Sequence, residues 1–191
     1  MGKRIGLLFL VVTSRLFAGM IDFTGPAPNP HAGDIFAVDV TVTGITDLYA
    51  FQFDVSFDPA LLSAVAVSEG AFLPGGGTTF FIPGTIDNVG GAISGNADAL
   101  IGAIPGVSGD GVLAEFQFTA LAPGTSALSF ANRILLDSSL NDITANTTFQ
   151  NGSVTIDAVS GVPEPEPVLL LCIGLLALIA ARCSRLRRGA V

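Results

Sequence analysis

The chain has 191 residues, of which 50% are hydrophobic and 13% are charged, and its mean hydropathy is +0.67. This composition excludes a disordered polyelectrolyte and is more apolar than that of an ordinary cytosolic enzyme. The apolar excess lies in residues 1–19 and 162–191. The residues between these two ends are enough for one hydrophobic core but not for two.

Charge divides the chain in the same way. Residues 20–161 contain 14 acidic residues and a single basic one, Arg133, for a formal charge of −13. A field of this sign repels phosphate backbones, so we expect no nucleic-acid binding. Both cysteines, Cys172 and Cys183, lie in the C-terminal tail, so the middle has neither a disulfide nor a thiolate metal site.

Residues 1–19 are predicted to be a signal peptide. Lys3 and Arg4 precede eight apolar residues, 5–12, a run that suits the core of a secretory signal and is too short to span a bilayer. The alternative is an uncleaved N-terminal anchor. We expect residues 20–32 to form a linker.

The C-terminal end has three parts. We expect residues 158–167 to form a Pro/Glu linker, because alternating prolines fix an extended backbone. Residues 168–181 carry no charge and predict a short transmembrane helix of about 21 Å, against about 30 Å for a bilayer core. The basic tail, 182–191, would stay in the cytoplasm. Its membrane-retaining residues are Arg182, Arg185, Arg187 and Arg188.

The motif Val162-Pro163-Glu164-Pro165, followed by a short apolar helix and a terminal arginine cluster, resembles the PEP-CTERM sorting signal. The resemblance implies a Gram-negative bacterium that makes exopolysaccharide, and cleavage near the motif by an exosortase. The precursor would then sit in the inner membrane before it reaches the cell surface or the extracellular matrix. An ordinary C-terminal anchor that is never cut is the alternative.

The middle of the chain alternates apolar and polar residues with the period of half-buried strands. Long alternating runs cover residues 35–43, 49–58 and 111–120, and shorter ones cover 64–67, 79–82, 127–130 and 153–156. Glycine-rich turns separate these runs, and most of the 14 phenylalanines fall at inward positions. The pattern predicts an all-β fold, an antiparallel β-sandwich.

Several motifs within residues 33–157 are similar, in type and order, to those of the cohesin module. They are Gly33-Asp34, residues 49–62, residues 109–118, and the ending 135–156. The resemblance implies a jelly-roll sandwich that binds a dockerin-type protein. Residues 72–106 match the family poorly, so no ligand-binding residue is assigned and the binding site is unknown. A generic sandwich of the related carbohydrate-binding superfamily is the alternative.

Catalysis finds little support in the sequence. His31, the single histidine, precedes the first predicted strand, where a solvated linker residue is commoner than a general base. Glu69 and Glu115 can in principle form a glycosidase pair with an aspartate, but solvated carboxylates are far commoner. We therefore expect no enzyme and no catalytic residues.

Metal and glycan sites also find little support in the sequence. Asp137, Ser139 and Asn141 have the spacing of a calcium loop, but Asp142 and Thr148 break the pattern and favour an Asx-turn. We expect no metal site and no cofactor, with Ca²⁺ as the open alternative. There is no tryptophan, and Phe80-Phe81 offers one exposed ring for sugar stacking.

The sequence as a whole predicts a non-enzymatic exported protein of the cell surface or biofilm matrix. Its expected partners are an exosortase, the membrane through the C-terminal helix, and a dockerin-like protein bound by the sandwich. The alternative is a module that binds polysaccharide.

Overall fold

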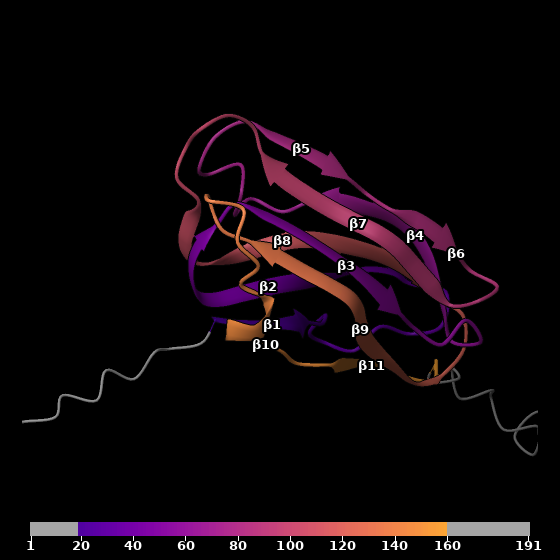
Figure 1. The fold of residues 1–191 in the computed structure, drawn as a ribbon. Helices are drawn as coiled ribbons and strands as arrows, with labels where there is room; N and C mark the ends of the chain where they lie inside the picture. Colours follow the sequence, from indigo (N-terminus) through magenta and orange to yellow (C-terminus); the bar gives the residue numbers. More distant parts are fainter. Residues whose placement is uncertain (1–18, 160–191) are drawn as a thin grey trace, which may run out of the picture. The chain divides into compact units, whose positions relative to one another are not determined.

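The structure is a computed structural model that describes residues 19–159, and residues 19–158 form one compact unit (Figure 1). The predicted signal core, PEP motif, short C-terminal helix and basic tail lie outside the described residues. Among residues 19–159, no helix has the length and apolar character needed to cross a membrane.

The described residues form two β-sheets that pack face to face, which confirms the predicted sandwich. One sheet has the order β10-β1-β2-β8-β4 and the other has the order β11-β9-β3-β7-β5, with β6 paired to β7 (Figure 1). All strand pairs are antiparallel except β1 and β10. The strands are β1 Gly19–Thr24, β2 Ile35–Leu48, β3 Ala50–Ser56, β4 Leu62–Glu69, β5 Thr79–Ile82, β6 Thr85–Asp87, β7 Ala92–Leu100, β8 Val107–Ala120, β9 Gly124–Leu136, β10 Thr147–Phe149 and β11 Gly152–Ile156, with a 3-10 turn, η1, at Thr144–Asn146.

The longest strands, β2 and β8, extend beyond their predicted ends. Register shifts interrupt their pairing after Val40 and after Val42. At the second shift Gly44 has a φ of +66° and donates its N–H to Asp110 Oδ1 at 2.6 Å. These bulges let the pair continue past the point where strict alternation stops in the sequence.

The prediction that residues 20–32 form a linker is wrong for residues 20–24. Gly19–Thr24 form β1, which pairs with β2 and with β10. Ile21 is fully buried, and Phe23 packs against the core. The sequence signal was weak because this short strand directly follows the predicted signal peptide.

Phenylalanine rings fill the space between the sheets. Phe53 of β3 is fully buried and lies 5.2 Å from Phe51, 6.3 Å from Phe116 and 5.4 Å from Phe130, centroid to centroid. Such ring pairs add to the hydrophobic gain from buried area. Among the described residues, Phe80 is the one phenylalanine that stays largely exposed, at 64%.

Candidate functional site: an apolar trough on one outer face

The outer face of the sheet β9-β3-β7-β5 carries two rows of cross-strand neighbours. The first row is Leu136, Ala50, Ala99 and Phe80, and the second is Ile134, Gln52, Ala97 and Ile82. Each row begins on β9, crosses β3 and β7, and ends on β5. Because side chains on one face of a sheet repeat every second residue, the two rows lie side by side. We call this set of eight residues the trough.

Residue size gives the trough its shape. Its floor, on β3 and β7, consists of three alanines and Gln52, whereas its walls on β9 and β5 consist of large apolar side chains. The resulting hollow has a volume of about 300 Å³. Short side chains between two ridges of long ones therefore create a concave site without any loop.

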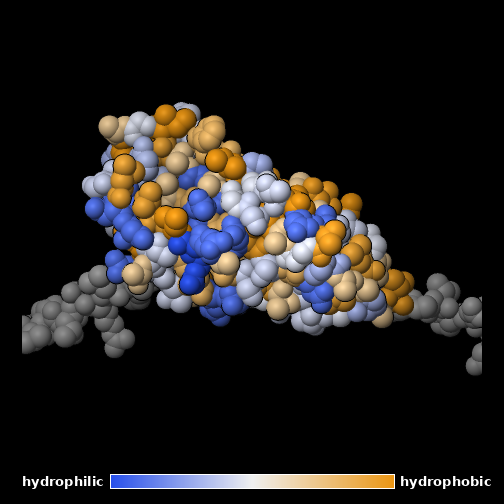
Figure 2. Space-filling view, turned by 45° about the vertical axis from the view of Figure 1, so that its right-hand side comes forward, coloured by the Kyte–Doolittle hydropathy of each residue, from blue (hydrophilic) through white to orange (hydrophobic). Residues whose placement is uncertain are grey.

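The walls of the trough are open to solvent. Phe80 is 64% exposed, and Ile82 and Ile134 are each 43% exposed. Phe81, the next residue, packs against the core, so one ring of the Phe80-Phe81 pair faces outward as predicted. Figure 2 shows hydrophobic patches at the top, at the height where Figure 1 places β5, and others on the left and along the right-hand edge.

Asp54, two residues after Gln52 on β3, is the centre of a polar network on the same sheet. Asp54 accepts hydrogen bonds from the Gly95 N–H at 2.7 Å and from Asn132 Nδ2 at 2.5 Å. Gly95 and Asn132 have φ values of +74° and +47°. Their bulges on β7 and β9 bring both donors to one carboxylate.

Strand β7, which supplies half of the trough floor, was missed by the sequence analysis. Its alanines face outward, whereas Asn96 and Asp98 face the interior and are 0% and 2% exposed. This is the reverse of the usual pattern, in which polar residues face water. The alternation Asn-Ala-Asp-Ala at 96–99 was the available signal, but apolarity alone does not identify such a strand.

The two glutamates considered for glycoside hydrolysis lie on opposite faces of one sheet. Glu115 stands opposite Ser68, and Glu69 stands opposite the fully buried Ala114. Glu69 does meet an aspartate, Asp98, whose pKa is raised to about 7 by burial and by the charge of Glu69. Glu69 is exposed but Asp98 is only 2% exposed, so the two carboxylates cannot flank a bound sugar.

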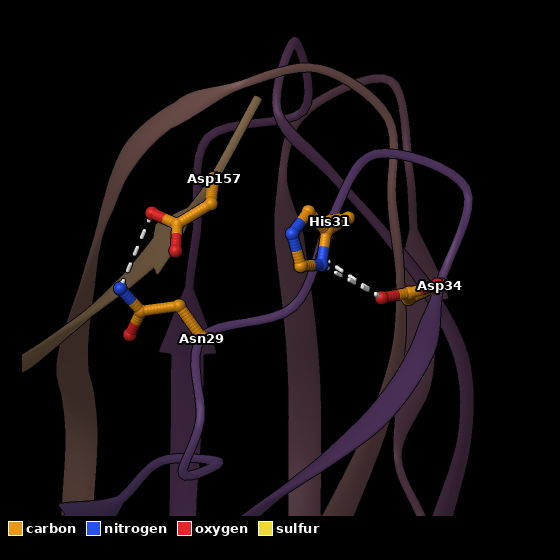
Figure 3. A network of polar contacts seen from close by, with 4 residues as sticks. All are labelled: Asn29, His31, Asp34 and Asp157. Atoms are coloured by element: carbon orange, nitrogen blue, oxygen red, sulfur yellow. Dashed lines mark hydrogen bonds and ion pairs between the residues drawn. The ribbon is translucent and has the colours of Figure 1, made fainter. Parts of the chain in front are cut away.

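His31 belongs to a group of polar contacts at one end of the sandwich (Figure 3). Its backbone N–H donates to Asp34 Oδ2 at 2.8 Å, and its Nδ1 lies 3.7 Å from the same oxygen. It also forms a bridge with Asp157, which accepts a 3.3 Å hydrogen bond from Asn29. These contacts join the segment before β2 to the residue after β11.

The loop at 137–142 contains the predicted Asx-turn. Asp137 Oδ1 accepts from the backbone N–H groups of Ser139 and Asn141 at 2.9 and 2.8 Å, and Oδ2 accepts from Asn141 Nδ2 at 2.9 Å. These donors, led by the Asn141 side chain, hold the pKa of Asp137 below its usual value. Within residues 19–159, no three His, Cys, Asp or Glu side chains are arranged to hold a metal ion.

The predicted sorting residues cannot be placed. Val162, Pro163, Glu164 and Pro165 and the four arginines of the tail all lie outside the described part of the chain.

The fold and the trough together define a β-sandwich module with one apolar outer face. The family model of the cohesin domain matches residues 24–156, and the chain therefore belongs to the cohesin family. No curated protein sequence matches the chain.

Solved cohesin structures share the fold. A non-cellulosomal cohesin from Archaeoglobus fulgidus is 17% identical, with a TM-score of 0.57 over 74% of this chain and 91% of that one. The cohesin of a type I cohesin–dockerin complex from Clostridium thermocellum is 17% identical, with a TM-score of 0.61 over 73% and 99%. The second type II cohesin of the ScaA scaffoldin from Acetivibrio cellulolyticus is 17% identical, with a TM-score of 0.62 over 73% and 97%.

Proposed function

We propose that this chain is a non-enzymatic recognition protein whose cohesin domain binds a dockerin-type protein through the trough. The observation that carries the proposal is the exposure of Phe80, Ile82 and Ile134 around a floor of small residues. Large exposed apolar side chains cost solubility, and contiguous sets of them mark interaction sites. Solved relatives include a cohesin in complex with a dockerin, which supports this class of partner.

The form of the trough favours a protein over a polysaccharide. The domain has no tryptophan, and Phe80 is the one ring on the walls, so sugar stacking would rest on a single side chain. A protein partner can instead place a bulky apolar side chain between the walls and against Ala97 and Ala99. The acidic domain, with Arg133 as its single basic residue, would attract a partner with a basic rim.

A pull-down with the full chain tests this proposal. The bait is wild type, Ala99→Arg or Gln117→Arg, and the native culture supernatant is divided into protease-treated and untreated halves. Ala99 lies on the trough floor, whereas Gln117 lies on β8 in the other sheet. We expect wild type and Gln117→Arg to capture the same polypeptide from the untreated half, and Ala99→Arg to lose at least about a hundredfold in affinity because a buried unpaired charge is costly.

Two results would contradict the proposal. Capture of a polysaccharide from both halves would replace the protein partner with a glycan. Equal capture by Ala99→Arg and wild type would show that the partner binds elsewhere on the domain.

We further propose that the protein is exported and sorted by the PEP-CTERM route. The support is the order of parts in the sequence: a signal peptide at 1–19, the motif Val162-Pro163-Glu164-Pro165, the short apolar segment 168–181 and the arginines of the tail. The precursor would be held in the inner membrane, cleaved by an exosortase, and delivered to the cell surface or matrix. The linker at 158–167 belongs to the same proposal. The sandwich itself begins before the predicted residue 33, because β1 starts at Gly19 and pairs with β2.

Replacement of Pro163, Glu164 and Pro165 by alanine tests the sorting route. We expect an unprocessed precursor that stays in the membrane fraction, measured by immunoblotting of cell fractions. Normal maturation and release of the variant would contradict this route and leave the proposal for the trough unaffected.

A further inference from the structure

Two carboxyl groups from opposite sheets meet at the edge of the sandwich. Glu69, the last residue of β4, accepts a hydrogen bond from the Thr79 hydroxyl of β5. The Glu69 carboxylate also contacts Asp98 of β7. Neither β5 nor β7 belongs to the sheet of β4, so these contacts join the two layers directly. We call Glu69, Thr79 and Asp98 the clasp.

Asp98 lies in apolar surroundings. Its Oδ1 accepts the Ala99 N–H at 2.8 Å, whereas its buried Oδ2 has no hydrogen-bond donor among the described residues. Its cross-strand partners are Phe51 on β3 and Phe81 on β5, and the charged group that acts on it is Glu69 on β4. Within residues 19–159, neither Asp98 nor Glu69 forms an ion pair with a basic residue.

An unpartnered carboxylate beside a second carboxylate is unfavourable in such a place. A proton on Asp98 removes one charge and turns the contact with Glu69 into an O–H···O hydrogen bond. Burial first, and the charge of Glu69 second, raise the pKa of Asp98 to about 7.

We propose that Asp98 and Glu69 share one proton at mildly acidic pH and so form a proton-dependent clasp between the two sheets. Loss of the proton leaves two negative charges in contact. Their repulsion pushes Glu69 of β4 away from Asp98 of β7 and so weakens the hydrogen bond of Glu69 to Thr79 of β5. Strand β5 also carries Phe80 and Ile82, one wall of the trough. The effect of the clasp on partner binding rests on the function proposed above, whereas the shared proton does not.

The variant Asp98→Asn tests the clasp because its amide can donate to Glu69 at every pH. A carboxyl whose pKa is raised by folding stabilises the protein fully below its unfolded pKa, near 4, and this stabilisation is lost as pH rises to about 7. Between these values, the ratio of the wild-type to the Asp98→Asn unfolding constant should rise by up to about tenfold per pH unit. Urea unfolding of the full chains, followed by circular dichroism, measures this ratio.

Glu115→Gln is the matched control. It removes a carboxylate from β8, the neighbour of β4, on the face of that sheet that points away from Asp98. Its unfolding constant should keep the wild-type pH dependence. A ratio for Asp98→Asn that does not change between pH 4 and 8 would overturn the proposal. So would a Ca²⁺-induced stabilisation at pH 8 that is present in wild type and absent in Asp98→Asn, because the pair would then hold a cation.

Carbon-13 NMR of the carboxyl groups in the wild-type chain tests the clasp without any variant. We expect the Asp98 carbon to titrate near neutral pH, and a titration near pH 4 would overturn the proposal. Neither measurement needs the partner, so failure of the clasp is separate from failure of the trough as a binding site. If both hold, the captured partner should bind wild type more weakly at pH 8 than at pH 6, and bind Asp98→Asn equally at both.

Discussion

The two outer faces of this sandwich differ in composition although they enclose the same core. On the sheet β10-β1-β2-β8-β4, a row of neighbours crosses from Thr24 through Asp39 and Glu115 to Ser68, and every member is polar. On the sheet β9-β3-β7-β5, the corresponding rows have a floor of three alanines and Gln52 between walls of Phe, Leu and Ile. One face is suited to water, and the other has the features of a face that a partner covers.

The inner side of the trough sheet is also unusual. Beneath Ala97 and Ala99, strand β7 buries Asn96 and Asp98, so polar and apolar residues have exchanged their usual sides. A strand with small apolar residues outside and polar residues inside gives up core stability, and its small outward residues form the floor of the trough. The polar face shows no such exchange, because Val38, Val40 and Phe116 are buried beneath it.

The largest effect on stability should come from a change in the core that the two faces share. Phe53 is fully buried and touches rings from both sheets. Truncation in Phe53→Ala should lower the free energy of unfolding by about 3–5 kcal/mol, because it leaves a cavity between the layers. Urea unfolding measures the loss, and an unchanged midpoint would mean that the two faces do not depend on a shared core.

A change confined to the trough should affect binding without affecting stability. Phe80 is exposed, so Phe80→Ala should change the free energy of unfolding by no more than about 0.5 kcal/mol. Loss of the aromatic side chain of the trough wall should weaken binding of the captured partner by about 2 kcal/mol, or roughly thirtyfold. Calorimetric titration of the captured partner into wild type and into Phe80→Ala measures this difference in affinity. Equal affinities would place the partner away from the β5 wall.

The sequence predicted the strands in which apolar residues point inward, and it failed where the core is polar or the strand is short. The alternation of Phe51 and Phe53 with polar residues identifies β3 without further knowledge. Strand β7 lacks that alternation because Asn96 and Asp98 occupy its inward positions. Strands β6 and β10, with three residues each, are too short to show a period, and β1 was missed because it directly follows the predicted signal peptide.

The trough was less accessible to sequence reasoning than the fold. Phe80 was identified as an exposed ring, but the trough exists only because Ala50 lies opposite Ala99, and Gln52 opposite Ala97. This register depends on pairing between segments more than forty residues apart along the chain. The contact of Glu69 with Asp98 is equally non-local, and neither residue is unusual in its own segment.

The edge of the polar face is protected by a side chain from the other sheet. Asn88, which follows β6, accepts the Ala64 N–H at 2.7 Å and donates to the Ala64 carbonyl at 3.0 Å. It thus satisfies both backbone groups of Ala64 on the unpaired edge of β4, next to Val65, which is 49% exposed. Asn88→Ala should cost about 1 kcal/mol for each of the two bonds and promote self-association, measured by urea unfolding and analytical ultracentrifugation. Asn88→Asp, which keeps the acceptor, is the control, and a monomeric Asn88→Ala of full stability would exclude this role.

The smallest effect should come from the polar face itself. Asp39 and Glu115 stand directly opposite each other on β2 and β8, and like charges in this position repel. Glu115→Gln should therefore raise the free energy of unfolding by a few tenths of a kcal/mol at low salt. The gain should vanish at high ionic strength, because both side chains lie on a solvated face. Partner binding should not change, and a weaker interaction would mean that the polar face, too, contacts the partner.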